Sequence, residues 1–149
     1  MKYTTVIGLL TLLSISACEN KTTPAPAKSS ATAEATAPPR SGHSADGTYE
    51  VRWEPVGGLI PDADPFAIDI LVVRTDGAAL DATCVVRVDA EMPQHGHGMN
   101  LVPTVKRGET PAAFRADGLL FHMSGRWMLA IDVDESGVAE RTQWFIDVD

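Results

Sequence analysis

Apolar and polar residues alternate along several short stretches of the chain, with the period of two that places successive side chains on opposite faces of a β-strand. In the first stretch, Tyr49, Val51 and Trp53 fall on one face and charged residues on the other. Residues 66–74 are almost continuously apolar and rich in β-branched side chains, which also indicates a strand. The same alternation is found in residues 82–92, 125–134 and 141–149.

Turn-forming residues separate these stretches. A Thr-Asp-Gly sequence follows residue 74, and Ala116–Gly118 is expected to form a tight turn into a strand over residues 119–123. Further short strands are expected over residues 99–105 and 112–116, and no helical period persists over a credible length. Seven or eight short strands predict an all-β fold, an antiparallel β-sandwich of immunoglobulin-like or cupredoxin-like type.

The first residues, MKYTTVIGLLTLLSISAC, have the features of a signal peptide. Lys2 supplies a positive charge, and the apolar run that follows is shorter than the roughly 20 residues needed to span a bilayer. The ending ISAC is similar to a bacterial lipobox, which predicts a lipoprotein signal peptide over residues 1–17 and acyl chains on Cys18. The alternative is an ordinary secretory signal, cut at an Ala-x-Ala-like site, with Cys18 an incidental thiol.

A lipidated Cys18 would anchor the chain in the cell envelope, facing the periplasm, and Glu19 at the next position slightly favours the outer membrane. Residues 19–44 contain no Leu, Ile, Val or aromatic side chain, so residues 18–45 are expected to form a disordered linker. His43 is expected to be a solvated part of that linker. The remainder, residues 46–149, is one domain's length of chain.

Charge and missing motifs exclude several functions for this domain. It carries eight Lys and Arg against 18 Asp and Glu, a net charge of −10, so it should not bind nucleic acid. Ser124 lacks the glycine two residues earlier that a GxSxG nucleophile has, no Glu follows the His-x-His pair as in a cupin, and three histidines are too few for a copper–zinc dismutase. We therefore expect that the protein is not an enzyme.

Cys84 precedes every candidate histidine, whereas the cysteine of a blue-copper site comes late, near the second histidine. It falls on the inward face of its strand and is expected to be a small core residue. With Cys18 lipidated it also has no partner for a disulfide.

Histidine and methionine gather in one short segment, MPQHGHGM, residues 92–99. In an extended chain, His95, His97 and Met99 would lie on the same side, because alternate residues do. Two imidazoles and a thioether so placed are able to bind one ion. Met92, just before the strand-breaking Pro93, is a weaker candidate ligand.

A second pair, His122 and Met123, belongs to a different expected strand. Strand neighbours point to opposite faces, so both would face one ion only if the chain were irregular there. Thioethers select Cu(I) and imidazoles suit copper and zinc, so a mixed set without thiolate favours copper. The alternative is that the methionines are core residues under Trp127 and the histidines a surface turn.

The segments MPQHGHGM and PAAFRADGLLFHMSGRWMLAIDV together resemble the YtkA-like/FixH-like periplasmic domains. The shared pattern is a Met-Pro start to a His/Met-rich loop, then aromatic-x-Met-x-Gly-x-Trp and an apolar strand. The resemblance implies a small β-sandwich that handles copper or supports assembly of periplasmic redox enzymes. It implies Gly125 and Trp127 as structural residues, and as metal ligands Met92, His95, His97, Met99 and Met123, to which this sequence adds His122.

Two functions follow as expectations. The first is a membrane-tethered periplasmic lipoprotein that binds copper, Cu(I) or Cu(II), for storage, delivery or tolerance, with a redox or copper-transport protein as partner. The second is a metal-free β-sandwich module that docks a periplasmic redox enzyme or oxidase through the same loop.

Overall fold

The computed structural model describes residues 40–149, in which the chain folds into nine β-strands and no helix. It follows that this part of the chain contains no helix suited to crossing a membrane. The signal peptide, Cys18 and most of the expected linker lie outside the described residues. The strands are β1 (Ser41–His43), β2 (Tyr49–Pro55), β3 (Phe66–Arg74), β4 (Val85–Met92), β5 (His97–Gly98), β6 (Thr104–Arg107), β7 (Ala113–Leu119), β8 (Gly125–Glu135) and β9 (Val138–Val148).

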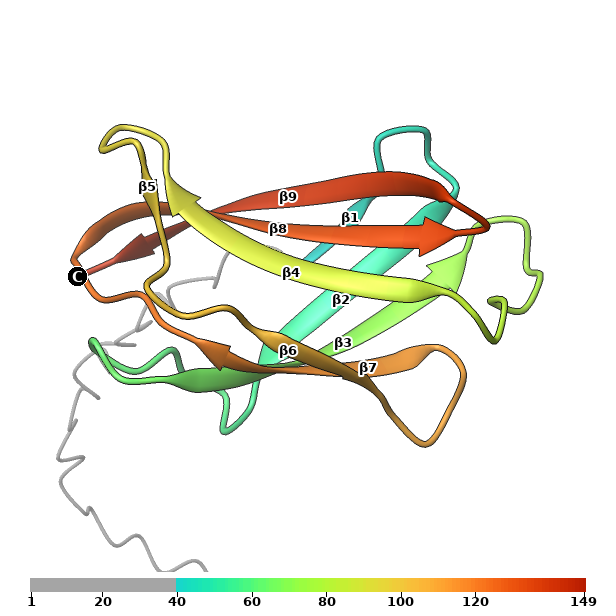
Figure 1. Ribbon diagram of the computed structural model, residues 1–149, viewed down its shortest axis with the longest axis horizontal. Helices are drawn as coiled ribbons and strands as arrows, with labels where there is room; N and C mark the ends of the chain where they lie inside the picture. Colours follow the sequence, from blue (N-terminus) through green and yellow to red (C-terminus); the bar gives the residue numbers. More distant parts are fainter. Residues whose placement is uncertain (1–39) are drawn as a thin grey trace, which may run out of the picture. The chain divides into compact units, whose positions relative to one another are not determined.

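The strands form two antiparallel sheets, which confirms the predicted all-β sandwich (Figure 1). One sheet has the order β1-β2-β3-β7-β6, and the other has the order β5-β4-β8-β9. All strand pairs are antiparallel. After β5 the chain crosses from the second sheet to the first, where it becomes β6.

The core lies between the sheets and includes the residues that the alternation had placed inward. Tyr49, Val51 and Trp53 are buried, as are the inward residues of β4 and β8. Cys84 is a buried free thiol, in agreement with its expected core role. Burial of these apolar side chains supplies most of the driving force for folding. The period-two pattern therefore predicted the inward faces of these strands correctly.

Residues before the expected domain boundary at residue 46 belong to the first sheet. Ser41–His43 pairs with β2, so His43 belongs to a strand, although its side chain is exposed. Ser44 is buried and its hydroxyl donates to the Glu140 carboxylate on β9, 2.6 Å away. The expected linker over residues 18–45 is thus wrong for its last residues, because backbone pairing and this hydrogen bond do not need apolar side chains.

The expected turn at Ala116–Gly118 is also wrong. These residues continue β7, and Gly118 has a φ of +89° opposite a register shift between Phe66 and Ala67. The glycine therefore serves a β-bulge rather than a turn. Residues 120–124 form an irregular loop that leads into β8, although residues 119–123 were expected to form a strand.

Glu140 on β9 holds the segment between β1 and β2 by hydrogen bonds, and its carboxyl makes the stability of the fold depend on pH. Burial raises the pKa of its carboxyl, but hydrogen bonds from the Ser44 hydroxyl and the Thr48 N–H outweigh burial, so the pKa lies below the ordinary value of 4.5. A lowered pKa means that the stabilisation is fully present above pH 4.5 and is lost as the pH falls through the folded-state pKa.

We predict that Glu140→Gln lowers the free energy of unfolding at pH 7 by about 1–3 kcal/mol, because charge-assisted hydrogen bonds to a buried group are lost. The difference between variant and parent should shrink as the pH falls below 4.5. Urea unfolding at several pH values measures both effects. Glu54→Gln is the control, since that side chain is 69% exposed. An equal loss in the two variants would contradict the buried role of Glu140.

Candidate functional site

A tight turn between β4 and β5 places His95 and His97 at one end of the sandwich. The N–H groups of His95 and Gly96 both donate to the carbonyl of Met92, at 3.0 and 2.9 Å. Gly96 has a φ of +67°, which a glycine adopts without strain. His95 therefore lies in the turn, and not in an extended segment as expected, while His97 is in β5. The two imidazole centroids are nevertheless 5.9 Å apart.

The loop of residues 120–124 brings a third histidine to the same place. The His122 ring lies 5.5 Å from the His97 ring, centroid to centroid. His97 is therefore the middle member of a row of three imidazoles, His95, His97 and His122, which we call the histidine row. Two segments about 25 residues apart in sequence contribute to it, as their loops lie at the same end of the sandwich (Figure 1).

Trp127 packs against two members of the histidine row, His97 and His122. Its indole is fully buried at the start of β8 and stacks on Phe121, with centroids 5.0 Å apart. The rings of His97 and His122 meet it edge to face, at 6.2 and 5.4 Å. The indole N–H donates to the carbonyl of Met123, 2.9 Å away. One aromatic side chain thus packs against both histidine-bearing segments and also fixes the backbone of one of them.

The nitrogen atoms of the row include one that lacks a partner. Nδ1 of His122 is buried and makes no hydrogen bond within residues 40–149. A buried polar nitrogen without a partner is costly and calls for an explanation, such as an ion or a water molecule. A neutral imidazole nitrogen without a proton has the lone pair that a metal ion needs.

The spacing of the rings is close to that of a shared metal site. Two imidazoles bound to one ion at about 2 Å and a tetrahedral angle have centroids about 5 Å apart. The donor atoms do not yet surround one point. Within residues 40–149, no three His, Cys, Asp or Glu side chains are placed to bind one metal ion. Because His95 is exposed, its ring is free to turn between rotamers and complete the set.

The methionines occupy three different environments. Met99 is half-buried, and its sulfur accepts a hydrogen bond from the Leu120 N–H at 3.4 Å. Met123 is 44% exposed on the loop beside His122. Met92 is 1% exposed and packs in the core, and its Cε lies 2.8 Å from where a Cβ on Gly125 would be. Of these three residues only Met123 is exposed, and Met92 is primarily a core residue.

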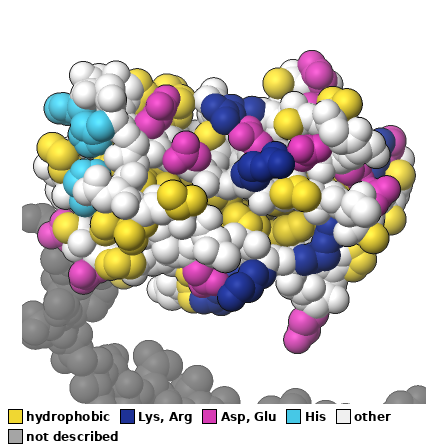
Figure 2. Space-filling view, in the orientation of Figure 1, with side chains coloured by type: hydrophobic (Ala, Val, Ile, Leu, Met, Phe, Trp, Pro, Cys, Tyr) yellow, Lys and Arg dark blue, Asp and Glu magenta, His cyan; other side chains and the backbone are white. Residues whose placement is uncertain are grey.

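The surroundings of the histidine row favour a cation. Figure 2 shows the histidines gathered at the end that carries β5, while the Lys and Arg side chains on this face lie towards the middle and the opposite end. The whole chain has a net charge of −8. An acidic molecule with no nearby cationic side chain on this face attracts metal ions.

The sequence predicted the three histidines as candidate ligands, but not the packing and hydrogen bonds that hold them in place. The donor N–H of Leu120 and the stacking of Phe121 on Trp127 depend on the irregular loop, which the alternation had assigned to a strand. A signal for the loop was present in Ser124-Gly125, which precedes β8.

Comparison with known proteins adds no further support. No protein-family model, no curated protein and no solved structure matches the chain. The resemblance to YtkA-like/FixH-like domains therefore stays a prediction.

We predict that Trp127→Phe loosens the loop of residues 120–124, because phenylalanine keeps an apolar ring but loses the hydrogen bond to Met123. The free energy of unfolding should fall by about 1–3 kcal/mol. Amide hydrogen exchange should quicken in residues 120–124. Trp144→Phe is the control, since its indole N–H bonds to Ser41 instead. Unchanged loop exchange in Trp127→Phe, or the same increase in both variants, would contradict the supporting role of Trp127.

Proposed function

We propose that the protein is a membrane-tethered lipoprotein of the cell envelope that binds one copper ion at the histidine row. The observation that supports this most is that the His97 ring lies between those of His95 and His122, with a buried Nδ1 on His122 that has no partner within residues 40–149. Three imidazoles from two segments, at an end that shows no Lys or Arg on the visible face, suit a metal ion better than they suit a surface turn.

Copper is the metal that this donor set fits best. Imidazoles suit Cu(II), Cu(I) and zinc, and thioethers add a preference for Cu(I). Met123 is exposed and follows His122 directly in sequence, so a thioether is available next to one of the histidines along the chain. Met99 is a weaker candidate ligand, because its sulfur already accepts a hydrogen bond from the Leu120 N–H. Met92 would take part only if the core opened.

The role would be storage, delivery or tolerance of copper, on a domain held near the membrane by lipid on Cys18. The support for the anchor is the sequence ISAC after a short apolar run. A periplasmic redox or copper-transport protein would be the partner.

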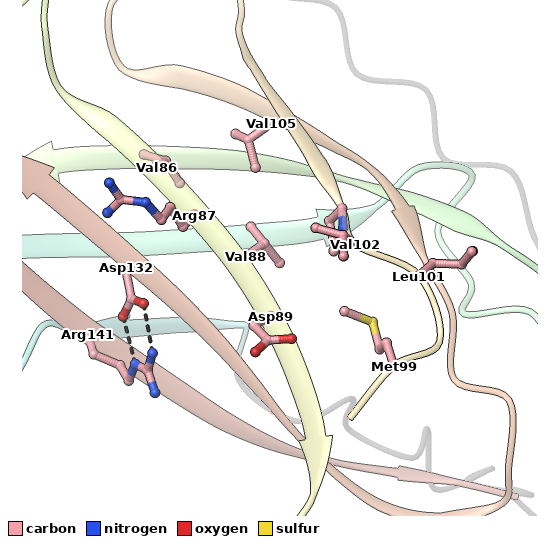
Figure 3. Close-up of a pocket in the computed structure, with 11 residues that line it drawn as sticks. Val86, Arg87, Val88, Asp89, Met99, Leu101, Val102, Val105, Asp132 and Arg141 are labelled. Carbon is pink, nitrogen blue, oxygen red and sulfur yellow. Dashed lines mark hydrogen bonds and ion pairs between the residues drawn. The ribbon is translucent and has the colours of Figure 1, made fainter. Parts of the chain in front are cut away.

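A groove beside the same end supports a second candidate, a metal-free docking module. The groove has a volume of about 510 Å³ and runs along β4, with Val86 and Val88 on one side and Met99, Leu101 and Val102 on the other (Figure 3). Val102 is 91% exposed. Exposed apolar side chains in a groove are typical of interaction surfaces. In this case copper would not bind, and a partner protein would cover the groove.

We predict that the full-length chain binds one copper ion and that His95→Ala together with His97→Ala abolishes binding. His122→Ala alone should weaken binding at least a hundredfold, about 2.7 kcal/mol, because its buried Nδ1 makes no hydrogen bond within residues 40–149 and is free to bind the ion. Equilibrium dialysis followed by metal analysis measures both stoichiometry and affinity.

His43→Ala is the matched control, for this exposed histidine lies in β1 and is not part of the row. It should bind copper as the parent does. Binding by the double variant at the parent's affinity would place the site elsewhere. Absence of copper binding by the parent would favour the docking module.

We also predict that Cys18→Ser abolishes lipid attachment to the protein, because the serine hydroxyl does not replace the thiol that carries the acyl chains. Metabolic labelling with a radioactive fatty acid, followed by immunoprecipitation, reports the attached lipid, and Cys84→Ser, at a buried thiol, is the control. A Cys18→Ser protein that is labelled as strongly as the parent would exclude the lipoprotein assignment.

A further inference from the structure

The proposed copper ligands are the three histidines of the histidine row and Met123, and they differ in how firmly the fold holds them. His97 and His122 are half-buried, and both rings pack against the buried indole of Trp127. His95 is exposed in the turn after β4, and Met123 is 44% exposed on the loop. The site therefore has a packed inner side and an open outer side.

We infer that the copper site is built for transfer: His97 and His122 retain the ion, and His95 and Met123 exchange for donors of an incoming acceptor. This inference rests on the proposed copper binding. A store would surround its ion with packed side chains, as metal ions that are not exchanged lie in closed sites. Here half of the donor set is in solvent, where side chains turn in nanoseconds or less and an acceptor has direct access.

The exchange requires no redox chemistry. A donor atom of the acceptor forms a bond to copper while the bond to His95 or Met123 breaks, and the oxidation state of the ion does not change. The released imidazole or thioether returns to water. When the acceptor has supplied further donors, the bonds to His97 and His122 break and the ion leaves with the acceptor.

This route predicts an exchange rate that depends on the acceptor. The full-length chain is loaded with one equivalent of Cu(II) and mixed with EDTA as the acceptor. Bound copper quenches tryptophan emission, and Trp127 lies against two of the proposed ligands, so recovery of fluorescence follows the loss of copper. The recovery rate should rise about tenfold when the EDTA concentration is raised tenfold. A rate that is the same at all EDTA concentrations shows slow release from a closed site and overturns the inference.

Two variants test the division into an inner and an outer side. His95→Ala should lower copper affinity about tenfold and keep the dependence on EDTA, whereas His122→Ala should lower affinity at least a hundredfold. Equal losses in both variants would overturn the division. Circular dichroism confirms that each variant is folded. A parent chain that retains no copper in dialysis refutes the proposed function itself, which is a different result from copper that binds but leaves at a constant rate.

Discussion

The packing of Trp127 is the interaction on which the rest of the histidine-bearing end depends. Its indole is fully buried, stacks on Phe121 and contacts the rings of both His97 and His122. Its N–H also holds the Met123 carbonyl. Without this side chain, the turn after β4 and the loop before β8 would lose the one ring that packs against both, and would keep the His97–His122 contact and the hydrogen bond from Leu120 to Met99. A β-sandwich supplies the rigid frame, and one aromatic residue at its end aligns two irregular segments.

The period of two was sufficient to predict the sandwich because burial follows it in most of the long strands. It assigned the inward faces of β2, β4 and β8 correctly. It missed β1, since Ser41–His43 has no apolar residue and is held by backbone pairing to β2 and, next to it, by the Ser44–Glu140 hydrogen bond. It also mistook Gly118 for a turn, because a glycine in a bulge and a glycine in a turn look alike in sequence.

The candidate site was predictable in its residues but not in its geometry. Spacing suggested His95 and His97, yet it assumed an extended segment where the chain makes a turn. The approach of His122 to His97 is a tertiary contact between two loops, and local pattern says nothing about it. Met92 shows the opposite problem: its position beside the histidines suggested a ligand, whereas its side chain fills the core below Gly125.

The central claim is that imidazoles from both segments bind a single copper ion. X-ray absorption at the copper edge of the loaded full-length chain measures this most directly, because imidazole rings give a characteristic multiple-scattering signal and thioethers give a longer sulfur shell. The account predicts three imidazole nitrogens, falling to two in His122→Ala, with at most one sulfur. A parent spectrum without imidazole scattering, or one that is identical in His122→Ala, would contradict it.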